Sequence, residues 1–485
     1  MLKPYLACLF ALLFSFAVQS QNALHAQKIA VIQQVIKGYN QHDYAAMRQP
    51  WIGIAKLFVT KSKLKKEFEN YHLRYGNLSI DTLISENKYV YVAKLKPSKI
   101  NQPNVYLSFI FNEKAKLEGF GESYPVLAYK KKIVHTYTPQ SFVEQMDSVI
   151  LKKYLFSANQ PFNGCLAVLD KGEIIYQKCN GFQDYSSKQS LNDTTVFELA
   201  SVSKQFTALA ILILEQKGLL KLSDTLQQFF PELPYSNISI ENLLNHSSGL
   251  PDYETLLKKV WDKSQFAYNS DVVKQLAIHQ PKALFPSGEQ FEYCNTGYVL
   301  LSSIIEKVSK HSYQQFLEQH IFEPLQMKHT RVFNTRRTAK EKIENYAYGY
   351  VYSGYKNEYV LVDSLAQYNY VIYQDGITGD GTVNSCIKDL QIWEREIINP
   401  QVMNPLLFEK AFQNRTLKNG TPTNYGYGFF ISGEEKLSYH TGGWPGYTSM
   451  VMNFLDQQKQ IIILSNNYYT HFTRMADEMA EALLK

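Results

Sequence analysis

The feature that most constrains the fold of this chain is a helix-length run of almost entirely apolar residues, from Phe206 to Leu214. A helix that is apolar on every side has to be covered all round by other elements, because burial of that surface is what stabilises it. Ser201 and Lys204 stand just before this run, and Gly218 ends it as a C-terminal glycine does. The sequence therefore predicts a buried central helix with a serine and a lysine at its start.

The chain is long enough for two folded units, with 485 residues of which 45% are hydrophobic. Residues 27–130 show a helical pattern followed by alternating strands, which indicates a small α+β domain. The second unit opens with a helix and two strands and closes with two strands and a helix from Phe472 to Leu484. This pattern predicts an α+β fold with an antiparallel sheet flanked by helices. We place the two domains at 21–133 and 134–485, with the boundary in a basic, turn-prone segment.

The amino terminus, residues 1–20, has the layout of a secretory signal peptide. Lys3 precedes an apolar stretch from Tyr5 to Val18, and small residues surround Ser20. No later run of about 18 apolar residues follows, so we expect a secreted or periplasmic protein without a membrane span once the signal is removed. The net charge of +6 is scattered, and the densest basic run, Lys61–Lys66, has no aromatic residues between its lysines. No nucleic-acid partner is expected.

Four of the five cysteines lie beyond the signal segment. Cys165 and Cys179 flank a hairpin turn expected at Lys171-Gly172. In a regular hairpin with that turn, Cys165 lies opposite Lys178 and Cys179 points to the other face of the sheet, so no bridge forms. We expect free, buried thiols.

Ser201 and Lys204 form a Ser-x-x-Lys string, which by itself is a weak signal. The same string also begins at Ser62, Ser85, Ser353 and Ser385. Only Ser201 opens a long apolar helix, and the spacing puts Lys204 on the same helical face, one turn away. Burial favours the neutral form of a lysine, and a neutral amine can take the proton of an attacking serine. The plainer alternative makes Ser201 a helix cap and Lys204 a surface residue.

Tyr293-Cys-Asn295 is the second candidate string, in a loop that runs into an apolar helix at 299–308. A tyrosine there could share a proton with Lys204, and the amide of Asn295 could donate to a substrate carbonyl. Tyr-x-Asn also occurs at Tyr75, Tyr235 and Tyr355. Standing alone, Tyr293 would be interpreted as an ordinary half-buried tyrosine.

The third string runs from Tyr439 to Gly446, is dense in glycine and precedes an expected strand. A ligand can approach such a backbone closely, and the polar side chains of His440 and Thr441 would then line the edge of a substrate cleft. A lone His-Thr-Gly is more often a turn.

The three strings together, in this order, resemble the serine β-lactamase and penicillin-binding-protein superfamily, in the branch with class C β-lactamases, D,D-carboxypeptidases and related esterases. The resemblance extends from about Thr138 to Lys485 and includes the segments Leu243–Pro251 and Gly379–Gly381. It implies a β-lactamase-like antiparallel sheet flanked by helices, plus an all-helical subdomain. The preceding hundred residues resemble NTF2-like or cystatin-like modules.

This resemblance implies a role for each residue of the candidate site. Ser201 is the nucleophile, and Lys204 with Tyr293 handles its proton. Asn295 contacts the substrate amide. The oxyanion lies between the backbone N–H groups of Ser201 and Gly443, a contact worth about 3 kcal/mol of barrier per donor.

His440 stands where many β-lactamases of this superfamily have a lysine. A histidine is only partly charged near neutrality, so it holds the carboxylate of a β-lactam less firmly than a fixed ammonium. We therefore expect an acyl-enzyme on Ser201 that acts on D-amino-acid peptides or small esters, with weak or absent β-lactamase activity. A catalytically silent binding or scaffolding module of the same fold is the main alternative, and a true β-lactamase is a further one.

Several other chemistries lack their sequence signatures in this chain. It has no Gly-x-Ser-x-Gly, Gly-x-Gly-x-x-Gly, Walker-type or His-Glu-x-x-His string, and its 11 histidines show no metal-ligand spacing. We expect neither a cofactor nor a metal.

Overall fold

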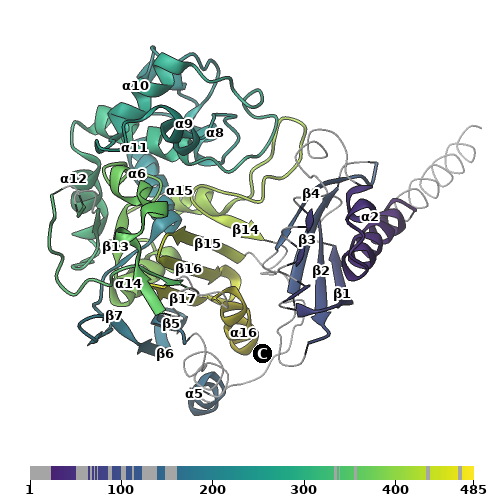
Figure 1. Cartoon of the computed structure of the whole chain (residues 1–485). Helices are drawn as coiled ribbons and strands as arrows, with labels where there is room; N and C mark the ends of the chain where they lie inside the picture. Colours follow the sequence, from purple (N-terminus) through teal and green to yellow (C-terminus); the bar gives the residue numbers. More distant parts are fainter. Residues whose placement is uncertain are drawn as a thin grey trace, which may run out of the picture. The chain divides into compact units, whose positions relative to one another are not determined.

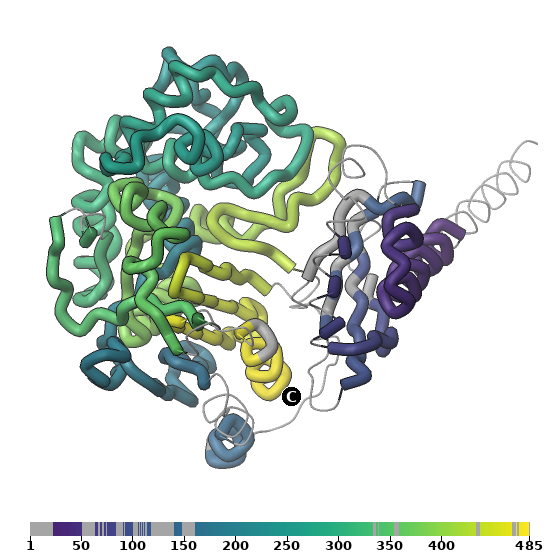
Figure 2. Tube along the Cα trace, in the orientation of Figure 1, coloured from purple at the N-terminus to yellow at the C-terminus, as the bar shows by residue number. Residues whose placement is uncertain are grey.

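The computed structural model divides the chain into two compact units, residues 1–131 and 132–485, which are considered separately (Figures 1 and 2). The described residues are 23–50, 64–65, 68–69, 72–73, 75–85, 90–99, 105–111, 114–122, 139–147, 161–332, 336–337, 339–353, 358–432, 437–467 and 472–484. The expected signal peptide and most of the expected boundary segment lie outside these residues.

In the described part of the first unit, a helix over residues 23–40 precedes a four-stranded antiparallel sheet in the order β1-β2-β3-β4 (Figure 1). Its elements are α2 (Tyr44–Arg48), β1 (Leu78–Ser85), β2 (Val90–Pro97), β3 (Val105–Phe111) and β4 (Leu117–Glu122). Ile32 of the helix and Phe109 of the sheet belong to one buried core. The expected order of helix and then strands is found here, and the NTF2-like likeness stays a prediction.

The second unit is built on a six-stranded antiparallel sheet in the order β14-β15-β16-β17-β5-β6. These strands are β5 (Gly164–Asp170), β6 (Glu173–Asn180), β14 (Phe430–Ser432), β15 (Leu437–Trp444), β16 (Tyr447–Phe454) and β17 (Lys459–Ser465). Because β5 pairs with β17, the start of the unit is joined to its end. The helices α14 (Ile387–Ile398) and α16 (Phe472–Leu484) both contact the sheet, and α5 (Pro139–Met146) packs on α16. The flanked antiparallel sheet is confirmed.

The chain from Lys204 to Phe322 contains helices and no strand, which confirms the all-helical subdomain. Its helices are α6 (Lys204–Gln216), α7 (Leu226–Phe229), α8 (Ile240–Leu244), α9 (Tyr253–Val260), α10 (Asn269–His279), α11 (Asn295–Ser309) and α12 (Tyr313–Leu317). In α6 every residue from Lys204 to Leu214 is buried, as the apolar run predicts. In the part of the chain that is described, no helix is both long and apolar enough to cross a membrane.

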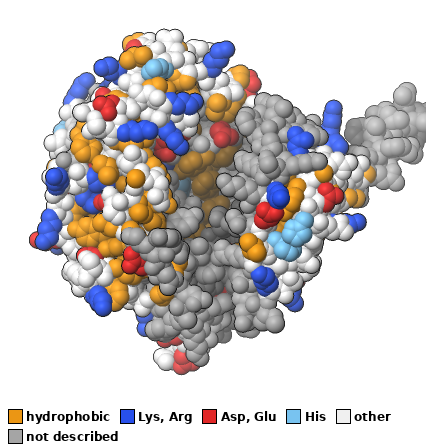
Figure 3. Space-filling model, viewed as in Figure 1, with side chains coloured by type: hydrophobic (Ala, Val, Ile, Leu, Met, Phe, Trp, Pro, Cys, Tyr) orange, Lys and Arg blue, Asp and Glu red, His pale blue; other side chains and the backbone are white. Residues whose placement is uncertain are grey.

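Short elements connect these two parts of the second unit. They are β7 (Phe182–Asp184), β8 (Gln189–Ser190), β9 (Phe197–Glu198), β10 (Arg331–Val332), β11 (Tyr350–Ser353), β12 (Glu358–Leu361), α13 (Tyr370–Tyr373), β13 (Val383–Ser385) and α15 (Pro405–Glu409). Basic and acidic side chains are scattered among hydrophobic and other side chains over the face of this unit that Figure 3 shows.

A disulfide joins Cys165 to Cys179, so the expectation of free thiols is wrong for this pair. The hairpin turn lies where the sequence predicts it, with Asp170 opposite Glu173. A β-bulge then adds Ile175 to β6 and shifts the register by one residue, which puts Cys165 directly opposite Cys179 with a Cα–Cα distance of 4.1 Å. The other two described cysteines, Cys294 and Cys386, are free and buried as expected.

Candidate active site

Ser201 and Lys204 lie at the junction of a short 3₁₀ turn, Ala200–Ser203, with the buried helix α6. The Lys204 Nζ donates hydrogen bonds to Ser201 Oγ at 3.1 Å and to the backbone oxygen of Asp380 at 2.7 Å. Lys204 is 0% exposed, so it is not the surface residue of the plainer interpretation. Ala200 has a φ of +48°, a left-handed conformation that costs a non-glycine residue about 1–2 kcal/mol. Such local strain is typical of a backbone that presents a functional side chain.

The string that contains His440 precedes strand β16 as expected, and His440 itself lies in strand β15, which the sequence did not predict. Strand β14 pairs with β15 only as far as Tyr439. The 3₁₀ turn that carries Ser201 packs against β15, whose edge beyond Tyr439 is not covered by β14. Gly442 permits this packing, because a Cβ at that position would lie 2.1 Å from the backbone oxygen of Leu199. Gly443 is exposed, and a Cβ added there would meet nothing within 4 Å.

The imidazole of His440 is buried, with 1% of the residue exposed. Its Nδ1 donates to the backbone oxygen of Thr441 at 2.7 Å, and its Nε2 accepts from the Tyr425 hydroxyl at 2.9 Å. Burial, helped by the nearby charge of Lys204, lowers the pKa of His440 to about 3. The ring is therefore neutral at physiological pH and both of its nitrogens are occupied.

Tyr293 lies beside the lysine, whose Nζ is 5.0 Å from the centre of the tyrosine ring. The Tyr293 hydroxyl is buried and has no hydrogen-bond partner among the described residues. The loop is held by His246, whose Nδ1 accepts the backbone N–H of Cys294 at 3.1 Å and whose ring lies 4.3 Å from that of Tyr293. His246 itself adopts a φ of +58°.

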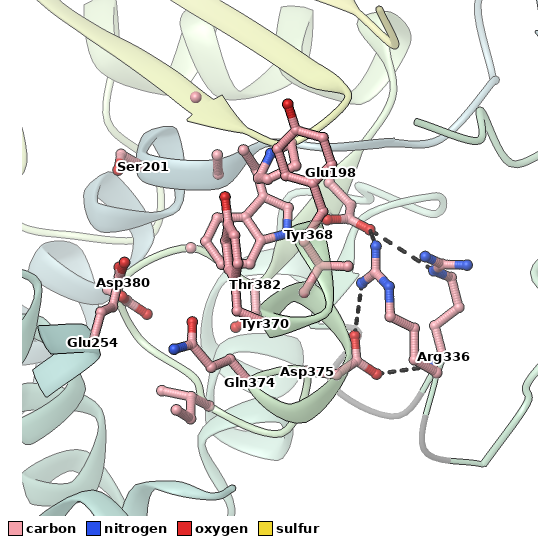
Figure 4. A pocket seen from close by; sticks show the side chains of 18 of the residues that line it. Glu198, Ser201, Glu254, Arg336, Tyr368, Tyr370, Gln374, Asp375, Asp380 and Thr382 are labelled. Atoms are coloured by element: carbon pink, nitrogen blue, oxygen red, sulfur yellow. Dashed lines mark hydrogen bonds and ion pairs between the residues drawn. The ribbon is translucent and has the colours of Figure 1, made fainter. Parts of the chain in front are cut away.

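A cavity of about 850 Å³ opens beside Ser201 (Figure 4). Asn295 and Gly443 also line it, whereas Lys204, Tyr293 and His440 stand behind its wall. Thr441 does not line it either. Six aromatic side chains contribute to the lining: Tyr253, Tyr346, Tyr352, Tyr368, Tyr370 and Trp444.

One end of the cavity carries a network of ion pairs (Figure 4). Arg337 donates to Glu198 at 3.1 Å, to Asp363 at 3.1 Å and to Asp375 at 2.8 Å. Arg336 adds a second bond to Asp363 at 2.8 Å. Burial alone would lower the pKa of Arg337, but these carboxylates outweigh it and hold that pKa well above its usual value.

The other end of the cavity has carboxyl groups without such partners. Glu254 accepts a hydrogen bond from Asn295 Nδ2 at 3.0 Å, and Asp380 accepts one from the Tyr253 hydroxyl at 3.0 Å. Burial, with the neighbouring Asp380 and Asp252, raises the pKa of Glu254 to about 7. Burial also raises the pKa of Asp380, although Lys204 opposes that shift.

Comparison with known proteins agrees with this geometry. Residues 158–484, more than half of the chain, match the family described as Beta-lactamase. The chain belongs to the β-lactamase family. Penicillin-binding protein 4* of Bacillus subtilis is 42% identical over 308 residues, which cover 63% of this chain and 68% of that relative. This β-lactamase family member is accordingly a serine hydrolase.

Two solved structures share the fold of this family member. D-amino acid amidase from Ochrobactrum anthropi SV3 has a TM-score of 0.55 and 23% identity, and the match covers 71% of this chain and 99% of the amidase. EstCE1, described as a hydrolase with promiscuous acyltransferase activity, has a TM-score of 0.58 and 18% identity, with 72% and 99% covered. At these identities the likeness concerns the fold alone.

Sequence reasoning missed several groups at the site of this β-lactamase family member. Tyr425 lies in an irregular stretch with no helical or strand periodicity, and Glu254 lies just beyond the segment that ends at Pro251. Neither position carries a string that marks it as functional. Among the described residues, no group of three or more His, Cys, Asp or Glu side chains is arranged to hold a metal ion.

Proposed function

We propose that this β-lactamase family member forms an acyl-enzyme on Ser201 and hydrolyses it, with amides or peptides of D-amino acids and small esters as acyl donors. The observation that carries the proposal is the 3.1 Å contact between the buried Lys204 Nζ and Ser201 Oγ at the wall of an open cavity. These acyl donors are the ones implied by the resemblance of the three strings to D,D-carboxypeptidases and related esterases, and a D-amino acid amidase shares the fold.

The reaction proceeds in two acyl transfers. Ser201 Oγ bonds to the substrate carbonyl carbon while its proton passes to Lys204 Nζ. The resulting oxyanion is stabilised by the backbone N–H groups of Ser201 and Gly443. The bond to the leaving amine or alcohol then breaks, and the leaving group takes the proton through the Tyr293 hydroxyl, which has no hydrogen-bond partner among the described residues. Attack by water on the ester releases the acid and restores Ser201.

Asn295 lines the cavity together with Ser201, which supports its assignment as a contact of the acyl group. Thr441 is adjacent to His440 on β15, and its side chain points to the opposite face of the strand. We assign Thr441 to the rim of the substrate site and Asn295 to the substrate amide.

The neutral imidazole of His440 argues against efficient β-lactam hydrolysis. A β-lactam presents a carboxylate, and a neutral imidazole with both nitrogens engaged offers it no charge. Nitrocefin turnover should therefore be weak beside turnover of a preferred substrate. Turnover typical of dedicated β-lactamases would overturn this part of the proposal.

The experiment that tests the acyl-enzyme is covalent labelling with a fluorophosphonate probe. The wild type should be labelled, Ser201→Ala should not, and the exposed-serine control Ser264→Ala should be labelled like the wild type. The same three proteins are then assayed on a D-alanyl-D-alanine peptide, a D-amino-acid amide, a short p-nitrophenyl ester and nitrocefin. A wild type that is neither labelled nor active would favour the silent module.

We also propose that the protein is exported and that residues 21–133 form an NTF2-like module. The layout of residues 1–20 supports export, and the helix and four-stranded sheet support the module. Fractionation of cells that express the chain with and without residues 1–20 tests export. Retention of both forms in the cytoplasm would contradict it.

A further inference from the structure

Hydrogen-bond acceptors without donors gather at the Glu254 end of the cavity. Asn295 uses its Nδ2 on Glu254, and its Oδ1 is buried with no partner among the described residues. Gln374 is 5% exposed, and its Oε1 is likewise buried without a partner in the described part of the chain. All three side chains line the same cavity, together with Asp380. Unpaired buried acceptors are costly, so a ligand that brings donors is favoured here.

The charge at this end points in the same direction. Of the four described carboxyl side chains that line the cavity, Glu198 and Asp375 are ion-paired with Arg337. Glu254 and Asp380 have no lysine or arginine side chain at ion-pair distance among the described residues. A ligand that is both a donor and a cation would satisfy the charge and the acceptors together.

An ammonium group has this chemistry, with three N–H donors, one positive charge and no acceptor. We propose that the cavity binds the α-ammonium group of the acyl donor between Glu254, Gln374 and Asn295. The preferred substrates are then amides or peptides with a free α-amino group. This inference rests on the proposed function, because it concerns the acyl donor of Ser201.

The α position follows from the arrangement of the site. In Figure 4, Ser201, Asp380 and Glu254 lie at one side of the cavity, and Arg336 lies at the other. Asn295, which we assign to the substrate amide, donates a hydrogen bond to Glu254. In the proposed acyl donor the carbonyl carbon meets Ser201 and the ammonium group, on the adjacent α-carbon, points to the Glu254 side of the same cavity.

A different role for Glu254 would act through Lys204. The charged and titratable groups that face Glu254 are Asp252, Asp380, Lys204, Tyr253, Tyr370 and Tyr373. If Glu254 served only to adjust Lys204, its loss would change the turnover of every substrate by the same factor. Substrate binding instead predicts a change that depends on the α-amino group.

The test compares D-alanine p-nitroanilide with its N-acetyl derivative by kcat/KM. The wild type should prefer the free amine, and Glu254→Gln should reduce that ratio about 30-fold or more, as expected for the loss of one partner of a buried charge pair. Glu254→Asp should recover part of the ratio. Glu289→Gln, an exposed carboxylate outside the cavity, should leave it unchanged.

The pH profile gives a second readout. Because the pKa of Glu254 is about 7, the preference of the wild type for the free amine should fall as the pH is lowered from 7 to 5, and in Glu254→Gln it should not. Equal loss on both substrates, or a wild type that prefers the N-acetyl compound, would overturn the ammonium site. Fluorophosphonate labelling of Ser201 is measured in the same samples. If Ser201 is labelled and the preference for the free amine is absent, the ammonium site is wrong while the acyl-enzyme proposal stands.

Discussion

The two ends of the cavity differ in whether their buried carboxyl groups are paired with a cation. At one end, Arg337 is bonded to three carboxylates, and its side chain is only 7% exposed. At the other end, Glu254 accepts a hydrogen bond from the neutral amide of Asn295, and the Oε1 of Gln374 has no donor among the described residues. Both ends are built from side chains far apart in the sequence, so the difference is not one of local structure.

The difference separates side chains that stabilise the fold from side chains that are suited to bind a ligand. A buried ion pair whose partners are all present fixes the segments that carry them, here Glu198, three residues before Ser201, and Asp375 beyond α13. A buried acceptor with no donor lowers stability, because its desolvation is not compensated. Its presence beside a nucleophile indicates a place where the substrate completes the set.

The largest effects are expected from the residues that handle the proton of Ser201. Lys204→Ala and Tyr293→Phe should each reduce kcat/KM by about 10³-fold or more, and the double variant should lose little more, because groups that act as a unit are not additive. The control Lys282→Ala removes an exposed lysine outside the cavity and should be silent. Near-normal turnover in either variant would show that the proton path is wrongly assigned.

The ion-paired end should give the next largest effect, and on stability. Arg337→Met leaves Glu198, Asp363 and Asp375 without their main cation, and removal of one partner from a buried network costs about 3–5 kcal/mol of unfolding free energy. Lys410→Met breaks the more exposed pair with Glu215 and should cost at most about 1 kcal/mol. Urea denaturation measures both. If Arg337→Met cost as little unfolding free energy as Lys410→Met, the ion pairs of Arg337 would not be what fixes these segments.

Much of the second unit was predictable because its signals are local. Helix α16 has the expected bounds, and the apolar run after Ser201 is the buried helix α6. The Ser201–Lys204 contact follows from helical spacing alone. Each of these features depends on periodicity within one short segment.

The contacts that the sequence did not predict have a different physical origin. The Cys165–Cys179 bridge depends on one bulged residue, which no hydrophobic pattern reveals. The pairing of Glu254 with Asn295 joins residues 41 positions apart, and that of Tyr425 with His440 depends on the path of an irregular stretch. Non-local contacts of this kind are set by the assembled fold.

The pH dependence of stability should distinguish Glu254 from an ordinary surface carboxylate. Its pKa is about 7 in the folded state and about 4.5 in the unfolded chain, so the folded state binds the extra proton between these values. This contribution to stability is present below pH 4.5 and is lost as the pH rises through 7. Relative to the wild type, Glu254→Gln should therefore gain several degrees in Tm between pH 5 and pH 8.

The control for this comparison is Glu289→Gln, whose Tm difference from the wild type should not change with pH, because Glu289 is exposed. Added D-alanine amide should reduce the difference at pH 8 by supplying the missing cation. A Tm difference for Glu254→Gln that is flat from pH 5 to pH 8 would contradict the buried, uncompensated carboxyl.

The smallest effect tests whether partnered and unpartnered polar atoms really differ. Tyr425→Phe removes the donor that His440 Nε2 has among the described residues, and the loss of a partner to that buried nitrogen should cost about 1–3 kcal/mol of unfolding free energy. Gln374→Met, by contrast, removes an oxygen that has no donor to lose, so it should cost less than Tyr425→Phe and could be stabilising. If Gln374→Met were the more damaging change in the ligand-free protein, its oxygen would already be satisfied within the fold. The Glu254 end of the cavity would then be part of the scaffold, like the Arg337 end.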